Sequence, residues 1–140
     1  MNKGNSRTSE RLLNKEIGAF CDKWIAIINN PDSKAFDFIE NLEFSDECRK
    51  LGFVMDCGNS FVEKYGQTVF NDPGALSATI ELIDDTIILG SAIFSQWRYY
   101  SHWAMDSFQG SKIETWVIIA FNRLKILSSN NLEGIGEIDG

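Results

Sequence analysis

The chain has 140 residues but only one histidine, two prolines and three cysteines, and this scarcity excludes several kinds of site. Cys21, Cys48 and Cys57 are odd in number and form no C-x-x-C pair, which argues against a disulfide framework and a structural zinc site. Because His102 is the one histidine, no histidine pair or helical Glu-x-x-His pattern is present to hold another metal. We therefore expect buried free thiols, no metal and no cofactor.

The sequence also lacks a long apolar run and a phosphate-binding loop. Its longest nearly uncharged apolar run, residues 86–94, is far shorter than the roughly 20 residues that span a bilayer. The first residues are polar and lead into a charged segment instead of an apolar signal region. Neither G-x-x-x-x-G-K-[ST] nor G-x-G-x-x-G occurs. We therefore expect a cytoplasmic protein that binds neither a membrane nor a nucleotide through these loops.

Acidic residues outnumber basic ones, and the net charge of −7 is unevenly distributed. Residues 1–15 carry four basic residues and one glutamate, whereas residues 31–85 carry twelve acidic and four basic residues, a local net charge of −8. Such a surface repels phosphate backbones and attracts basic proteins. We therefore expect a basic protein partner and no direct nucleic-acid binding, the alternative being a solvated face that keeps the protein soluble.

Apolar residues recur at helical spacing at both ends of the chain. Steps of four, three, four and four over residues 13–28 predict a first helix that is capped at position 8 or 9 and ends before the first proline. A second stripe over residues 113–127 predicts a last helix, opened by a capping box at residues 111–114.

Shorter helices are predicted between these two. Residues 32–42 and 45–51 indicate two of them, the second ended by Gly52 in a left-handed conformation. A capping box at residues 60–63 then predicts a short helix that ends at Gly66.

The segment 86–103 is rich in isoleucine and aromatic residues, which favour strands, but its apolar and polar residues do not alternate. We therefore predict a helix that is buried over most of its circumference. The α+β alternative has a strand over residues 87–94 and another near residues 53–56. Asp72 and Pro73 are expected to start the preceding helix, and Asp85 either faces outward or caps the segment.

Together these patterns predict a mainly α protein, with about five to seven helices in a single compact domain over residues 9–128. Residues 1–8 are polar and predict a flexible arm. Residues 129–140 are rich in glycine, asparagine and acidic residues and predict a disordered tail.

Residues 97–103 concentrate two of the four tryptophans, two of the three tyrosines and the histidine. One interpretation places these rings in the core of the domain, with the arginine paired to a carboxylate. The other places them at an edge of the bundle, because arginine, tyrosine and tryptophan are enriched at binding hot spots. The candidate partner-binding residues, with the acidic residues of the preceding turn, are Trp97, Arg98, Tyr100, His102, Trp103, Glu81, Asp84 and Asp85.

Arg98 and His102 would share one face of a helix. This pair resembles the R-x4-6-H motif of the HEPN class of metal-independent helical ribonucleases. Three residues separate Arg98 from His102, one fewer than that motif requires, and Tyr99 stands where the family usually has a small polar residue. The resemblance implies an alternative function, RNA cleavage by Arg98 and His102, which the acidic charge of the chain opposes.

Two longer motifs carry a second resemblance. Residues 51–58, LGFVMDCG, and residues 89–103, LGSAIFSQWRYYSHW, together with the closing helix at residues 116–127, resemble a group of small bacterial proteins. That group shares the patterns LGF-x-MDCG and LGSAIFS-x-WRYY-x-HW and has no assigned activity. The resemblance covers most of the chain after residue 51 and implies a compact bacterial domain without indicating a function.

The sequence thus favours a small, acidic, non-enzymatic protein-binding module. One concrete form is an inhibitor or immunity-type protein that covers the basic cleft of a nucleic-acid-processing enzyme, because it presents charge similar to that of nucleic acid. The alternatives are the ribonuclease, with Arg98 and His102 as catalytic residues, and a structural or oligomerising domain.

Overall fold

The computed structural model describes the backbone of residues 3–30, 41–54, 58–103 and 111–139, and the side chains of residues 13–30, 41–54, 58–102 and 111–129. Within these residues the chain forms seven α-helices, one 3-10 helix and no strand, which confirms the mainly α prediction. The elements are α1 (Lys3–Asn29), α3 (Leu42–Leu51), α4 (Asn59–Tyr65), α5 (Gln67–Asn71), α6 (Pro73–Thr79), the 3-10 helix η1 (Ile80–Leu82), α7 (Thr86–Trp103) and α8 (Lys112–Asp139).

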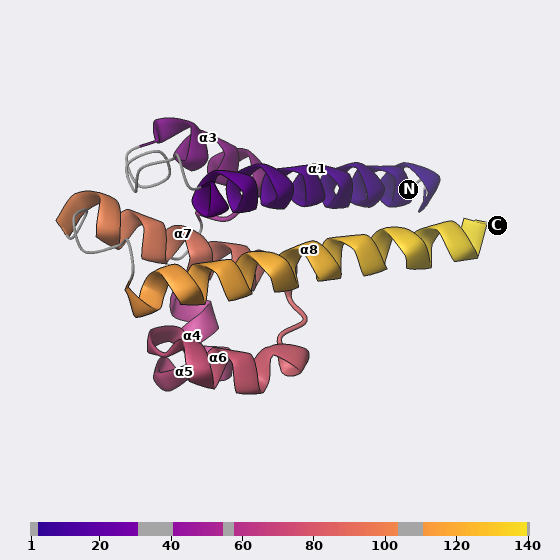
Figure 1. The fold of residues 1–140 in the computed structure, drawn as a ribbon. Helices are drawn as coiled ribbons and strands as arrows, with labels where there is room; N and C mark the ends of the chain where they lie inside the picture. Colours follow the sequence, from indigo (N-terminus) through magenta and orange to yellow (C-terminus); the bar gives the residue numbers. More distant parts are fainter. Residues whose placement is uncertain (1–2, 31–40, 55–57, 104–110, 140) are drawn as a thin grey trace.

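Helix α8 packs against α1, α6 and α7, and its contact with α1 is the most extensive between any two elements of the described residues. Figure 1 shows α1 and α8 as two long neighbouring helices, with α3 on the side of α1 and α4 to α6 on the opposite side of α8. Helix α7 also contacts α3 and α4, so it joins the two sides of the molecule. The largest fully buried side chains include Trp24 of α1, Phe44 of α3, and Trp116 and Phe121 of α8.

The predicted helix over residues 86–103 is confirmed as α7, and the strand alternative over residues 87–94 is wrong. The helix buries Leu89, Ser91–Phe94, Gln96 and Trp97, so buried residues cover most of its circumference as expected, two of them polar. Phe53 and Val54 form a turn instead of a strand, and residues 55–56 lie outside the described residues.

Two side-chain donors complete the hydrogen bonding at the end of α5. An extended helix would use the N–H of residue 73 to bond the carbonyl of Val69, but Pro73 has no N–H. Instead, the indole Nε1 of Trp116 donates to the Val69 carbonyl at 2.7 Å. The amide of Gln96 donates to the neighbouring Phe70 carbonyl at 2.8 Å. Helices α7 and α8 thereby hold α5 in place.

Several predicted helix ends are confirmed. Gly52 ends α3 with φ of 82°, and Gly66 ends α4. The carboxylate of Asp72 caps α6 by accepting from the Ala75 N–H, with proline in the first turn. Asp85 caps α7 in the same way, through the Ile88 N–H at 2.9 Å. At the start of α8 the Ser111 hydroxyl accepts from the N–H of residue 114 at 3.2 Å.

Other boundaries differ from the prediction. Helix α3 begins at Leu42 and is capped by Asn41, three residues before the predicted start. Most of the helix predicted over residues 32–42 lies outside the described residues, and its last residue belongs to α3. The capping box predicted at residues 60–63 is wrong, because the N-cap of α4 is Gly58 with φ of 85° and no side-chain cap bond.

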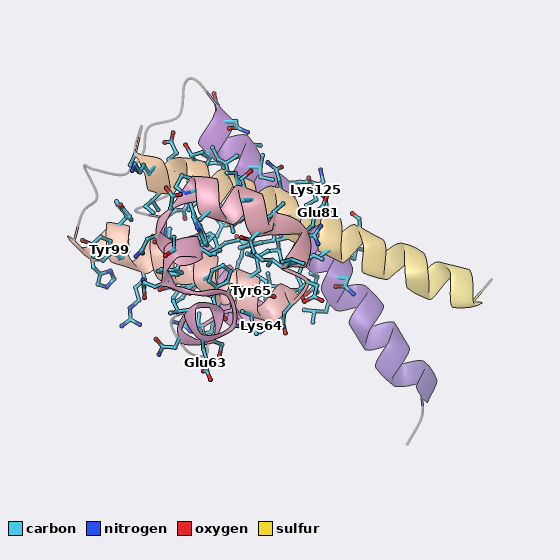
Figure 2. All side chains as sticks on the ribbon, turned by 90° about the horizontal axis from the view of Figure 1, so that it is seen from below. Glu63, Lys64, Tyr65, Glu81, Tyr99 and Lys125 are labelled. Atoms are coloured by element: carbon cyan, nitrogen blue, oxygen red, sulfur yellow. The ribbon has the colours of Figure 1, made fainter. Side chains whose placement is uncertain are left out.

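The two ends of the chain are helical in the structure, in place of the predicted arm and tail. Helix α1 begins at Lys3 and α8 continues to Asp139. Neither terminal segment contains a proline that would stop a helix, and each continues a helix that is packed in the domain. Figure 2 shows the outer ends of α1 and α8 diverging beyond the body of the domain.

Candidate protein-binding surfaces

The aromatic residues near the end of α7 lie partly in the core and partly on the surface. Trp97 is only 4% exposed, and its ring centre lies 5.3 Å from that of Phe44 and 5.8 Å from that of Phe94. Its side chain is therefore part of the core and does not face a partner in this conformation. The side chain of Trp103 lies outside the described residues.

The exposed part of this segment consists of Arg98, Tyr99 and His102, with Tyr100 half-buried beside them; we call these four residues the α7 end. Tyr99 is 55% exposed and meets the Tyr100 ring edge-on at 5.1 Å. The Nδ1 atom of His102 lies 3.0 Å from the hydroxyl of Ser101. Burial raises the pKa of Tyr100, and the neighbouring Tyr99 raises it further. A hydrogen bond with the residue that precedes α8 lowers this pKa by a smaller amount.

The acidic residues of the predicted site do not lie at the α7 end. Asp85 caps the start of α7, and Arg98 follows it by 13 residues, about 20 Å at 1.5 Å per residue. Figure 2 shows Tyr99 at one end of the molecule, well apart from Glu81. Asp84 lies 3.8 Å from Lys64 of α4. The structure therefore divides the predicted site into two separate surfaces.

The second surface is a turn that follows α6, and we call its residues Glu81, Leu82 and Asp84 the acidic turn. Arg123 of α8 holds this turn, because its Nε donates to the Ile83 carbonyl at 2.9 Å and its Nη2 to the Glu81 carbonyl at 3.2 Å. Leu82 is 73% exposed, and Glu81 and Asp84 on either side of it in the sequence are exposed as well.

Sequence reasoning did not identify Leu82 as a surface residue, although a signal was present. Leu76, Ile80 and Ile83 follow the helical steps of four and three, and position 82 falls outside that stripe. Both Leu76 and Ile83 are fully buried, whereas Leu82 points away from the core. On α8, Ile126 follows Arg123 by three residues and is also exposed.

A shallow groove of about 330 Å³ lies between α1 and α3. Its apolar lining consists of Ala19, Phe20 and Leu51. Two acidic and two basic residues complete the lining: Glu16, Lys23, Glu47 and Lys50. One of these lysines already forms ion pairs with carboxylates of α3. Because the charges of the rim balance, the groove does not favour a ligand of either sign.

Other kinds of site find little support in the described part of the chain. Burial raises the pKa of the Cys21 thiol to about 12, with a smaller contribution from Asp22, and burial also raises that of Cys48. Cys57 lies outside the described residues. No group of three or more potential metal ligands occurs among the residues that the structure describes. None of the described helices is long and apolar enough to cross a membrane.

The described residues thus form a helical domain with two exposed candidate surfaces of different character. Comparison of the chain with protein-family models, with curated proteins and with solved structures finds no match. The resemblance to the group of small bacterial proteins stays a prediction.

Proposed function

We propose that this protein is a small, non-enzymatic binding module that docks on a basic protein through the acidic turn. The observation that carries this proposal is that Leu82 is exposed in a short turn whose sequence neighbours Glu81 and Asp84 are exposed as well. An exposed apolar side chain and exposed carboxylates in the same turn provide the two parts of a docking site. The apolar group supplies buried area, and the charges select a partner of opposite sign.

Two further features of the turn support this role. Arg123 holds the backbone carbonyls of residues 81 and 83, so little conformational entropy would be lost when a partner binds. The contact of Asp84 with Lys64 is a surface ion pair at 3.8 Å, and such pairs contribute little stability. A cation of the partner can therefore replace Lys64 at small cost.

An inhibitor of a nucleic-acid-processing enzyme is one concrete form of this function. Residues 59–85 carry five acidic residues and one lysine, a local net charge of −4. A basic cleft that attracts phosphate groups would also attract this surface. Docking there would exclude nucleic acid from the cleft by competition.

Affinity capture from a lysate of the cells that produce the protein tests the proposal. The tagged chain is expected to retain one basic protein in near-equal amount at low salt and to lose it at high salt, because salt screens exposed charges. Asp84→Lys is expected to abolish this capture. Asp46→Lys on α3 is the matched control, since the two aspartates are similarly exposed (74% and 68%) and each lies in a long surface ion pair.

Equal capture by the two variants, or a partner that is not basic, would contradict the proposal. The ribonuclease alternative makes a separate prediction, because Arg98 and His102 are both exposed and lie four residues apart on α7. It predicts RNA turnover that His102→Ala abolishes without unfolding the domain. The binding proposal predicts no turnover by either protein.

A further inference from the structure

The groove between α1 and α3 shares no residue with the acidic turn, and its size suits a small molecule. Its volume of about 330 Å³ lies at the lower end of the range of about 300–1,000 Å³ for small-molecule sites. Its lining includes Phe20, whose ring centre lies 5.5 Å from that of Phe44 and 5.7 Å from that of Phe53. Because these rings are part of the core, this wall of the groove is formed before a ligand binds.

Helical spacing brings the lining side chains together. On α1 they occupy positions 16, 19, 20 and 23, and on α3 positions 47, 50 and 51. Residues three and four apart share one face of a helix, so each helix turns a single face toward the groove. Ion pairs of Lys23 with Glu43 and Glu47 join the two helices on one side of it. Positions 16 and 50 lie about one turn or more away from these pairs along their helices.

Two of the four charged side chains in the lining are therefore already paired, and two are available. Lys23 donates to Glu47 at 2.8 Å. Glu16 of α1 and Lys50 of α3 form no ion pair with each other or with any other residue in the described part of the chain. The groove thus offers one carboxylate and one ammonium group, one from each helix, beside an apolar wall.

We propose that this groove binds a small zwitterion with an apolar side chain, the chemical class of the apolar amino acids. The ammonium group of such a ligand is complementary to the Glu16 carboxylate, and its carboxylate is complementary to the Lys50 ammonium group. Its side chain can cover the apolar surface of Ala19, Phe20 and Leu51. A ligand with a single charge would leave one of the two groups without a partner and would be repelled by it. Since no residue is shared, this site does not rest on the proposed function.

An NMR titration of the ¹⁵N-labelled full chain with L-leucine at neutral pH tests this inference. The amides of residues 16–23 and 47–52 are expected to shift and to saturate with a Kd of about 1 mM, which is typical for a ligand of this size. Three rival ligands each lack one part: glycine the apolar side chain, N-acetyl-leucine the ammonium group and leucinamide the carboxylate. Each should bind about fivefold more weakly than leucine, or less well still.

Two variants connect the binding to this groove. Ala19→Gln places a longer side chain in the groove and should weaken leucine binding about tenfold. Ala26→Gln is the matched control, since both alanines are exposed on α1 and only Ala19 lines the groove. Lys50→Gln should weaken the binding of leucine about fivefold and leave that of leucinamide unchanged, because leucinamide has no carboxylate to lose a partner.

Three results would overturn the inference: no saturable shift with leucine, a rival ligand that binds as tightly as leucine, or an equal loss in Ala19→Gln and Ala26→Gln. The spectrum of each variant also shows whether its fold is retained. Asp84→Lys should bind leucine like the original protein, so failure of this site is distinguishable from failure of the proposed function.

Discussion

At the scale of single residues, the contact between Gly90 and Phe53 limits how closely α7 can approach the rest of the core. A Cβ atom at position 90 would lie 2.4 Å from carbons of the Phe53 ring, and this ring is fully buried. A buried ring cannot move aside without disturbing its neighbours, because protein interiors are closely packed. The glycine is therefore required by the packing and not by a turn.

Gly90→Ala is therefore expected to lower the free energy of unfolding by about 1–3 kcal/mol, the usual cost of overpacking a core. Urea unfolding followed by circular dichroism measures this change. Gly18→Ala on α1 is the control, because its new Cβ would meet its nearest neighbour, the Ser128 hydroxyl, at an ordinary 3.5 Å. That variant should be as stable as the original protein or gain up to about 1 kcal/mol from helix propensity. A neutral Gly90→Ala variant would contradict the packing.

Because its thiols are buried, the domain is expected to become less stable as the pH rises through the alkaline range. Burial raises the pKa of Cys21 from its ordinary value of 9.0 to about 12 in the folded protein. Between these values the unfolded chain loses a proton that the folded chain keeps, so the free energy of unfolding falls as the pH rises. The pKa of Cys48 is shifted in the same direction.

Urea unfolding of a Cys57→Ser variant at pH values from 8 to 10 checks this prediction, and Cys21→Ala in the same background should lose less stability over that range. Iodoacetamide should modify Cys21 and Cys48 only in the unfolded protein. Rapid alkylation of both thiols in the folded protein would show that they are not buried.

At the scale of elements, side chains of α7 and α8 support the short segments that local sequence alone does not stabilise. Helix α5 has five residues and depends on Trp116 and Gln96 for its last carbonyls, while η1 depends on Arg123. Isolated helices this short are unstable in water. These segments are therefore defined by tertiary contacts.

Arg123→Gln should accordingly loosen the turn while leaving the long helices intact. Two hydrogen bonds from a charged group are lost, and we expect a decrease of about 1–3 kcal/mol in the free energy of unfolding. Hydrogen exchange of the amides of residues 80–85 should accelerate more than that of α1 or α8. Lys125→Gln is the control, since it removes only a surface ion pair with Asp22. Similar exchange in the two variants would contradict the role of Arg123.

The helix ends show which features of this fold local sequence can predict. Asp72, Asp85 and Ser111 were predicted as capping residues, and each bonds an N–H within three residues of itself. The start of α3 and the existence of α5 were missed. The α5 segment has no apolar periodicity, and its end depends on Trp116, 47 residues away in sequence. Local patterns do not contain such contacts.

At the scale of the whole molecule, the sequence identified residues of both candidate surfaces but did not show that the two surfaces lie far apart. Trp97 and Arg98 are adjacent in sequence, yet one is in the core and the other on the surface. The sequence analysis grouped Glu81 and Asp84 with the residues of the α7 end in one site, but the length of α7 separates them. Helical spacing assigns residues to faces, whereas the distance between the acidic turn and the α7 end depends on how α6, α7 and α8 pack.

The most direct test of the acidic turn measures the Kd between the purified partner and three versions of this protein: the original, Leu82→Ala and Leu42→Ala. The two leucines are matched, being 73% and 75% exposed. The proposal predicts that Leu82→Ala weakens binding about tenfold, as for an interface anchor, while Leu42→Ala binds like the original. An unchanged Kd for Leu82→Ala would contradict it.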